Sequence, residues 1–313
     1  MAVRSRRQGH ALPKSFYLAR RAILRWYTYN GRKLPWRNIR DPYRILIAEI
    51  MLHQTQVRRV LQTFPKFLKR FPTLKTLASA RQSDVIVAWR GMGYNSRAVR
   101  LHRLAHNLID EHGGNIPRTV QEIQRLPGVG RYTAHALMTA VHREDLPVVD
   151  VNVRRVFSRL FWRMTTTVET RREEEIWALA AQLVPRNRGY DWTQALMDLG
   201  ATICTARAPA CSSCPVGMIC TSRSTMRAVR PRRSSREPSM AGVPNRIYRG
   251  KIVDLLRNTR TGCPIRKIGQ TVLAGYSPRH HSWLQMLLEG LQKDGLIAVR
   301  GKFTDASARA RLA

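Results

Sequence analysis

Apolar residues recur at three- and four-residue spacing over the first two thirds of the chain, as in the series Leu101, Leu104, Ala105 and Leu108. The alternation typical of strands is nearly absent there. The pattern predicts an all-α core between residues 15 and 203. The expected helices cover residues 44–60, 84–89, 97–112, 120–125, 131–141, 151–162, 173–183 and 192–203.

Composition changes along the chain divide it into five segments. A basic arm covers residues 1–14, the helical core 15–203 and a cysteine-containing loop 204–220. Residues 221–244 are rich in Arg, Ser and Pro, which is typical of a solvated linker. A C-terminal domain covers residues 245–313.

The C-terminal domain returns to a regular pattern. Helices are expected over residues 248–257, 265–272 and 282–293, followed by a short hairpin at 294–303 with glycines at its turns. Three helices closed by a hairpin resemble a small winged helix. A plain helical bundle with a frayed tail fits the same pattern.

The charge of the chain indicates a polyanionic partner. Among 313 residues, 55 Lys and Arg stand against 20 Asp and Glu, a formal net charge of +35. Nucleic acid is the simplest partner of such an excess. A membrane surface is disfavoured, because no apolar run approaches 18 residues. The N-terminal sequence lacks the apolar core of a signal peptide, so we expect a cytoplasmic protein associated with DNA.

Four cysteines form a compact C-x6-C-x2-C-x5-C array, at Cys204, Cys211, Cys214 and Cys220. Four thiolates this close suit one metal centre, either a [4Fe–4S] cluster or tetrahedral zinc. Disulfides are disfavoured by the odd total of five cysteines and the lack of a signal peptide. The remaining cysteine, Cys263, is interpreted as a plain thiol.

A glycine-containing turn, Leu126-Pro127-Gly128-Val129-Gly130, separates two expected helices. Its glycines permit a tight turn and leave backbone amides accessible at the start of the next helix. Such amides bind phosphate oxygens without reading base sequence. An ordinary turn between two helices fits the same sequence.

Two carboxylates are candidates for chemistry. Glu49 is the one charged residue in the apolar series 45–52, where burial would raise its pKa and prepare it to donate a proton. A structural ion pair with an arginine is the alternative. Asp150 opens the helix expected at 151–162, and helix amides would keep it ionised as an N-cap. One acid and one anion are what cleavage of a glycosidic bond requires.

Together these motifs resemble the adenine DNA glycosylase family, within the helix-hairpin-helix, iron–sulfur DNA glycosylase superfamily. The resemblance runs in order over roughly residues 25–220. It is carried by the stretches 34–37, 41–44, 49–57, 91–94, 126–134, 148–155 and 197–201 and by the four cysteines.

The resemblance implies a two-lobed glycosylase core, a [4Fe–4S] cluster on the four cysteines, and duplex DNA containing a mispair as the partner of a monomeric enzyme. It implies removal of adenine opposite 8-oxoguanine or guanine, with Glu49 protonating the base and Asp150 stabilising the sugar cation. The other implied residues are Asn152 and Tyr132 beside these carboxylates, Trp36, Arg37 and Gln194 at the base pocket, Gln54 and Tyr94 in the base stack, and Gly128, Val129, Gly130 and Arg207 on DNA.

Three features depart from the family. His53 replaces a usual glutamine, one helical turn from Glu49, where a solvent-facing histidine is the simple interpretation. Val151 replaces a glycine. The C-terminal domain does not resemble the nucleotide-pyrophosphohydrolase-like domain with which the family recognises 8-oxoguanine.

Two other functions fit the sequence. A thymine or uracil glycosylase acting on T:G or U:G mispairs shares this core and a tyrosine at Tyr132. A non-catalytic DNA-binding regulator would keep the scaffold without needing both carboxylates. Bifunctional relatives carry a lysine in place of Tyr132, and no lysine occurs between Lys75 and Lys251. The chain is therefore expected to lack lyase activity, with Lys33 as the one reserve amine.

Overall fold

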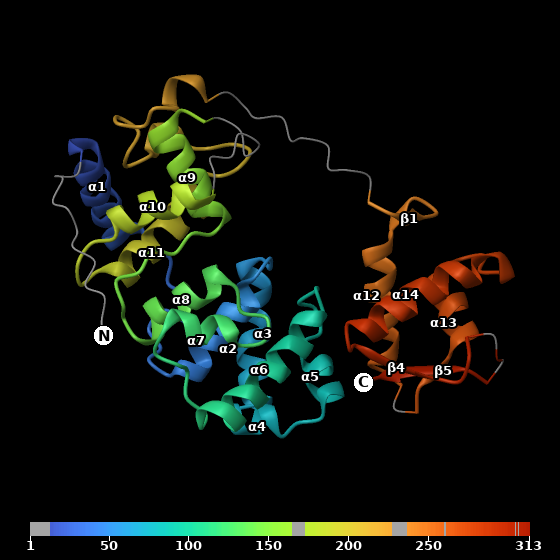
Figure 1. Cartoon of the computed structure of the whole chain (residues 1–313). Coiled ribbons are helices and arrows are strands. Elements are labelled where there is room, and N and C mark those ends of the chain that lie inside the picture. The colour runs from blue at the N-terminus through green and yellow to red at the C-terminus, as the bar shows by residue number, and fades with distance from the viewer. Residues whose placement is uncertain (1–12, 165–172, 227–236, 260, 304, 306) are drawn as a thin grey trace. The chain divides into compact units, whose positions relative to one another are not determined.

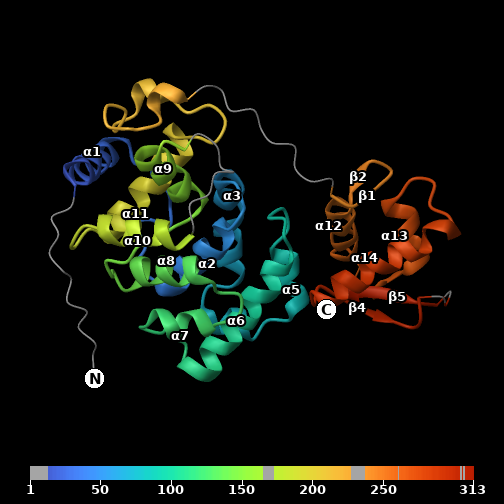
Figure 2. The ribbon, with the colours of Figure 1, turned by 45° about the horizontal axis from the view of Figure 1, so that its top comes forward.

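The computed structural model describes residues 13–164, 173–226 and 237–313, apart from residues 260, 304 and 306. Most of the expected basic arm and the middle of the expected linker lie outside the described residues. The chain forms two compact units, each from two separate stretches: Met1–Arg37 with Arg131–Arg232, and Asn38–Gly130 with Arg233–Ala313. Helices dominate both units, as expected (Figures 1 and 2). No helix in the described ranges is long and apolar enough to cross a bilayer.

The first unit is helical throughout its described part. Its elements are α1 (Lys14–Asn30), α8 (Arg131–Val141), α9 (Val151–Trp162), α10 (Glu173–Leu183), α11 (Gly189–Asp198), a π-helical turn (Leu199–Ile203) and two 3-10 turns (Cys211–Ser213 and Arg223–Thr225). Ile23, Phe157, Ile176 and Leu196, one each from α1, α9, α10 and α11, share one core and are at most 2% exposed. Each such side chain stabilises the fold by roughly 1.5–3 kcal/mol.

The first part of the second unit consists of six helices: α2 (Pro42–Leu52), α3 (Val57–Arg70), α4 (Leu74–Ala78), α5 (Gln82–Ala88), α6 (Ser96–His112) and α7 (Val120–Arg125). The carboxylate of Asp41 starts α2 by accepting the backbone N–H of Tyr43 at 2.9 Å. The fully buried Phe67 and Trp89 meet edge to face, with ring centroids 5.9 Å apart. These contacts join α3 to the end of α5.

One expected helix proves to be two. Residues 44–60 were predicted as a single helix, but α2 ends at Leu52 and α3 begins at Val57. Gln54, in the intervening turn, has a φ of 51°. No glycine or proline marks this turn, which is why the apolar pattern alone did not predict it.

The C-terminal domain has the element order of a winged helix, which confirms the expectation. After a short hairpin of β1 (Ser239–Met240) and β2 (Val243–Pro244) come α12 (Asn245–Leu256), β3 (Cys263–Pro264), α13 (Ile265–Val272), a 3-10 turn (Pro278–His280), α14 (His281–Lys293), β4 (Ile297–Arg300) and β5 (Arg309–Leu312). The antiparallel sheet has the order β3-β5-β4.

The expected hairpin at 294–303 was wrong in its second strand. Ile297 of β4 pairs with Leu312 of β5, so the chain crosses residues 301–308 before it returns. Ala310 of this returning strand is buried, as is Ala308 just before it. Its alternating arginines conceal the pattern in the sequence.

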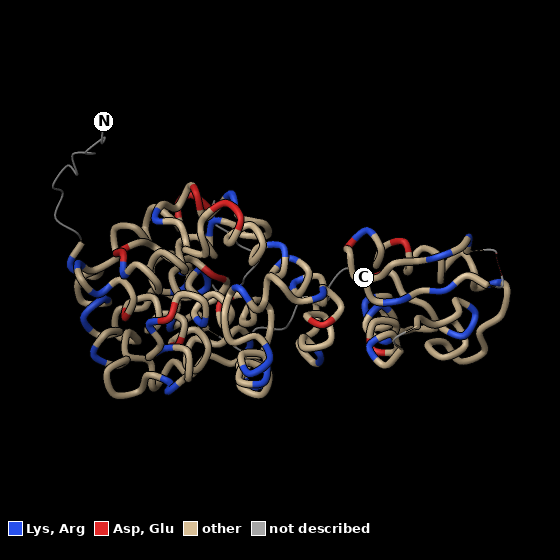
Figure 3. Tube along the Cα trace, turned by 90° about the horizontal axis from the view of Figure 1, so that it is seen from below, with Lys and Arg blue, Asp and Glu red and all other residues tan. Residues whose placement is uncertain are grey.

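Polar contacts hold the winged helix to α5 and α6 within the second unit. Arg257 donates from Nε to the carbonyl of Ile86 at 3.1 Å and from Nη2 to the Asn95 side chain at 2.9 Å. Gln82 donates to the carbonyl of Gly295 at 2.8 Å. Basic residues are distributed over the elements of both units (Figure 3).

Candidate active site

Asp150 caps α9 and is held by three N–H donors. Its carboxylate accepts the backbone N–H groups of Asn152 and Val153 at 2.8 and 2.7 Å, and the side-chain amide of Asn152 at 2.7 Å. Donors at a helix N-terminus stabilise an anion. Asp150 is therefore held as an oriented carboxylate, with Asn152 as its direct partner.

Arg155 continues this network towards the cysteine loop. It donates to the Asn152 side-chain oxygen at 2.8 Å, to the Gly200 carbonyl at 2.7 Å and to the Cys204 carbonyl at 2.8 Å. A Cβ on Gly200 would lie 2.6 Å from the Cβ of Asn152, so only glycine permits this close approach. The backbone before the cysteines is thus fixed against the Asp150 helix.

Arg37 and Gln194, both expected at the base pocket, are brought together. Arg37 Nε donates to the Gln194 side-chain oxygen at 2.9 Å. Its two terminal nitrogens donate to Asp198 at 2.7 and 2.6 Å, and Arg32 adds bonds from its backbone N–H at 2.8 Å and from Nε at 2.7 Å. Trp36, which precedes Arg37 in the sequence, is also buried, with 8% of its surface exposed.

Asp198 is the residue that sequence reasoning missed. It is fully buried, and burial alone would raise the pKa of its carboxyl. The hydrogen bonds from Arg37 and Arg32 outweigh burial, so this pKa is lowered and the carboxylate stays charged. The signal was the one carboxylate in the helix expected at residues 192–203, the same kind of signal that drew attention to Glu49.

The glycine turn before α8 is tightly packed. Gly128 has a φ of 77°, and a Cβ there would lie 3.0 Å from Cδ of Arg100. Val129 is buried and donates its N–H to the Leu126 carbonyl at 3.1 Å. Tyr132 is half-buried in the first turn of α8. The geometry fits a helix-hairpin-helix turn, and the contacts with DNA expected of residues 128–130 stay predictions.

Glu49 lies on α2, half-buried between the buried Ala48 and Ile50. It belongs to the second unit, whereas Asp150 and Tyr132 belong to the first. Their joint role, like the raised pKa expected of Glu49, stays a prediction.

His53 caps the C-terminus of α2 and is half-buried, so the interpretation as a solvent-facing histidine is wrong. Burial, together with the charges of Arg97 and Arg100, lowers its pKa to about 4. His53 is therefore neutral near pH 7. Val151, the other departure in the core, is 73% exposed.

The two residues expected to enter the base stack share an uncommon backbone conformation. Gln54 and Tyr94 have φ values of 51° and 43°, in the left-handed region that non-glycine residues rarely adopt. Tyr94 is 60% exposed and Gln54 is exposed. Strained backbone that presents an exposed side chain is typical of functional loops.

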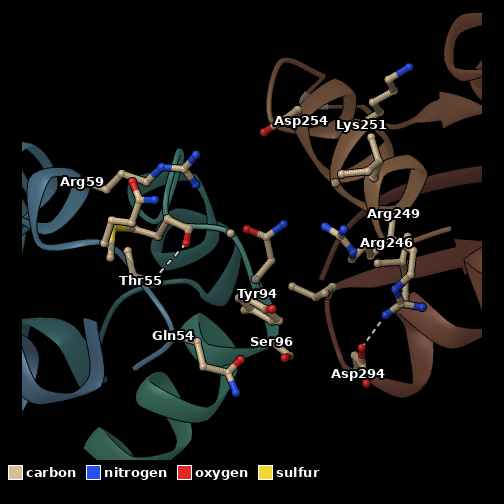
Figure 4. A pocket seen from close by; sticks show the side chains of 18 residues that line it. Gln54, Thr55, Arg59, Tyr94, Ser96, Arg246, Arg249, Lys251, Asp254 and Asp294 are labelled. Atoms are coloured by element: carbon tan, nitrogen blue, oxygen red, sulfur yellow. Dashed lines mark hydrogen bonds and ion pairs between the residues drawn. The ribbon is translucent and has the colours of Figure 1, made fainter. Parts of the chain in front are cut away.

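A cavity of about 670 Å³ adjoins these two residues within the second unit. Gln54 and Tyr94 line one side, and Arg246, Arg249 and Lys251 of α12 line the other (Figure 4). Asp294 forms an ion pair with Arg249 at its edge. The cavity therefore combines an exposed aromatic ring with several cations.

The four cysteines of the array line one small cavity, together with Arg159. Burial raises the pKa of Cys214 to about 11 and also raises that of Cys220. Arg159 donates to Cys204 Sγ at 3.5 Å and to the Thr205 carbonyl at 2.7 Å. Within the described ranges, no three His, Cys, Asp or Glu side chains are arranged to hold a single ion.

Two further residues named in the sequence analysis, Arg207 as a DNA contact and Cys263 as a plain thiol, lie outside this cavity. Arg207 is exposed on the loop between Cys204 and Cys211. Cys263 is buried in β3 of the second unit, and burial raises the pKa of its thiol.

Comparisons with known proteins show to which family the chain belongs. Residues 47–182 match the HhH-GPD superfamily of base excision DNA repair proteins. An adenine DNA glycosylase of Mycolicibacterium smegmatis is 35% identical over 286 residues, which cover 90% of this chain and 95% of that protein. The chain belongs to the adenine DNA glycosylase family. The resemblance drawn from the motifs is confirmed.

Other members of the superfamily match a smaller share. Human adenine DNA glycosylase is 41% identical over 213 residues, 65% of this chain but 39% of the human protein. The chain thus spans about two fifths of the length of its mammalian family relatives. A thermostable thymine-DNA glycosylase of known structure is 32% identical, with a TM-score of 0.63, and covers 68% of this chain and 98% of its own.

Proposed function

We propose that this member of the adenine DNA glycosylase family removes adenine mispaired with 8-oxoguanine or guanine in duplex DNA, as a monomer and without a lyase step. The observation that carries the proposal is the Asp150 carboxylate, fixed by two backbone N–H groups and the Asn152 amide. A fixed anion stabilises the oxocarbenium-like sugar that forms when a glycosidic bond breaks.

In this mechanism Glu49 donates a proton to the adenine, and Tyr132 forms a hydrogen bond beside it. The bond between the base and C1′ of the sugar breaks, and the bonding electrons leave with the protonated adenine. Asp150 stabilises the cation until water adds to C1′ and gives up a proton. An intact abasic site remains, because tyrosine at position 132 supplies no amine to form an imine.

The ion-pair cluster of Arg37, Gln194 and Asp198 supports a base pocket. Asp198 fixes the guanidinium of Arg37, and Arg37 in turn fixes the amide of Gln194. An amide with one defined orientation can distinguish the donors and acceptors on a base edge. Trp36, next to Arg37, supplies a flat apolar surface to this pocket.

Gln54 and Tyr94 would fill the space that the flipped base leaves in the stack. Flipping costs a few kcal/mol of unstacking, which an inserted side chain offsets. The nucleotide left in the other strand would lie in the adjoining cavity, where Arg246, Arg249 and Lys251 attract phosphate. In this proposal the winged helix takes over the recognition of the opposite base.

The four cysteines would hold a [4Fe–4S] cluster. Their thiols line one cavity, and four thiolates are the ligand set that such a cluster takes. A bound cluster would cross-link the loop through these cysteines. Arg155 and Arg159 then connect that loop to α9 through their bonds to the carbonyls of Cys204 and Thr205.

Single-turnover glycosylase assays on duplexes with A:8-oxoG, A:G, T:G and U:G test the proposal. We expect strand cleavage after alkali with the two adenine mispairs only, and no covalent complex after borohydride. Cleavage of T:G or U:G instead would assign the activity of the thymine-DNA glycosylase that this chain resembles. A borohydride-trapped complex that disappears in Lys33→Ala would refute the monofunctional mechanism.

A further inference from the structure

Arg97, in the first turn of α6, donates six hydrogen bonds to residues in and around the turns that carry Gln54 and Tyr94. Its side chain is buried, and the residue is 7% exposed. Nη1 donates to the carbonyls of Ile50 and Met51, at 3.1 Å each, and to that of His53. Nη2 donates to Thr55 Oγ1 at 2.7 Å and to the carbonyls of Met92 and Gly93 at 3.1 and 3.3 Å.

These acceptors belong to the end of α2 and to two separate turns. One turn follows α2 and contains Gln54, and the other precedes α6 and contains Tyr94. The last carbonyls of a helix have no partner within the helix, so Nη1 caps α2 while Nη2 binds the second turn. Thr55 strengthens the link, because its hydroxyl accepts from Arg97 and donates to the Met92 carbonyl at 3.3 Å.

Aromatic rings enclose the same guanidinium. Its Cζ lies 5.3 Å from the ring centroid of Trp89 and 5.8 Å from that of Tyr94. All the partners that the described residues give to Arg97 are carbonyl or hydroxyl oxygens and aromatic rings, and none is a carboxylate. Burial lowers the pKa of Arg97 to about 10, so it remains charged at neutral pH. A buried cation without an anionic partner costs stability, which argues for a role beyond packing.

We propose that Arg97 is the positioning residue of the base-stack wedge, the pair Gln54 and Tyr94. Its guanidinium holds both turns in the left-handed backbone conformation that presents these side chains to the duplex. The inference rests on the proposed base-flipping function and adds to it a residue that touches neither the base nor the sugar. Lysine cannot replace it, because one ammonium with three protons cannot reach acceptors on both turns in a planar fork.

The test compares two substrates. One is a duplex with A:8-oxoG, and the other has the same adenine flanked by abasic sites, which removes the stacking that a wedge must replace. Arg97→Lys should lower single-turnover excision about 10- to 100-fold on the intact duplex, the scale of a misplaced positioning group. On the unstacked substrate the loss should shrink to within about threefold.

Two controls sharpen this experiment. Arg70→Lys, a change of the same kind on an exposed arginine, should leave both rates unchanged. Thr55→Val keeps the shape of the side chain but removes its hydroxyl, so it should give a milder loss with the same dependence on substrate even if Arg97→Lys folds poorly. The losses caused by Arg97→Lys and Tyr94→Ala should be less than additive in the double variant, because both changes act on the same wedge and only Gln54 is then left for Arg97 to position.

Equal losses on the two substrates, or additive losses in the double variant, would show that Arg97 acts through general folding and would overturn the inference. If the unaltered protein excises no adenine, the proposed function fails by itself. In that case the fluorescence of 2-aminopurine in a duplex still reports base flipping. If wild type and Arg97→Lys then change the 2-aminopurine fluorescence equally on binding, the positioning role of Arg97 is rejected.

Discussion

The buried carboxylate of Asp198 allows a quantitative prediction. In Asp198→Asn the side chain keeps its shape but loses its charge, and its new amide group faces the donors of Arg37 and Arg32. Arg37, 8% exposed, is then a buried cation without its anion. Breaking one partner of a buried pair costs about 3–5 kcal/mol. That is a large part of a typical total of roughly 5–15 kcal/mol.

The matched control is Asp84→Asn. Its ion pair with Arg70 has almost the same length, 2.7 Å against 2.6 Å for Asp198 with Arg37, but both partners are more than 40% exposed. Exposed pairs contribute about 0–1 kcal/mol. The control therefore has an ion pair of similar length but lacks the burial of Asp198 and the further bonds that Asp198 accepts from Arg37 and Arg32.

Urea unfolding followed by tryptophan fluorescence and circular dichroism measures both variants. With a slope near 2 kcal/mol per molar urea, Asp198→Asn should lower the midpoint by about 2 M and Asp84→Asn by less than about 0.5 M. Excision by Asp198→Asn should also fall, because Arg37, which orients Gln194, loses the carboxylate that fixes its own position. Equal midpoint changes in the two variants would refute the reasoning from burial.

Three further predictions use other residues. Glu49→Gln should reduce single-turnover excision about 10²- to 10⁴-fold while duplex binding in a filter assay is retained; unchanged excision would exclude Glu49 as the acid. The folded pKa of His53, about 4, lies below its unfolded value, so the unfolded chain binds more protons between about pH 4 and 6.5 and stability falls as the pH drops through that window. His53→Gln should therefore lose less stability between pH 7.5 and 5 in urea titrations, and an identical loss would contradict the burial of His53. Cys211→Ser should reduce the iron content and the broad visible absorbance of anaerobically purified protein, whereas stoichiometric zinc without iron in the unaltered protein would argue against a cluster.

The sequence predicted most helices because their apolar positions follow one helical period. It failed at residues 53–56, where the period continues through a turn. The turn is stabilised by Arg97, an arginine that in the sequence looks like any other basic residue of a helix. A contact between positions more than 40 apart leaves no local signal, so tertiary packing overrides propensity here.

The candidate site shows the same limit. Asp150 could be predicted as an N-cap because capping depends on neighbours in sequence, and its bonds reach only two and three residues ahead. The partnership of Arg37, Gln194 and Asp198 joins residues about 160 positions apart. Composition indicates that such a chain binds a polyanion, but it cannot show which of its many arginines are buried ion-pair partners.

The discontinuous make-up of the first unit has a consequence for how the protein is synthesised. Arg32 and Asp198 are 166 positions apart, and the stretch Asn38–Gly130 of the other unit is translated between them. At roughly 5–20 residues per second, a ribosome needs about 8–33 s to deliver Asp198 after Arg32. During that interval α1 has emerged with Ile23 and Leu24 still lacking the partners that later bury them. The nascent chain therefore exposes the apolar face of α1 throughout this interval, and that face is what a chaperone bound at the ribosome exit would protect.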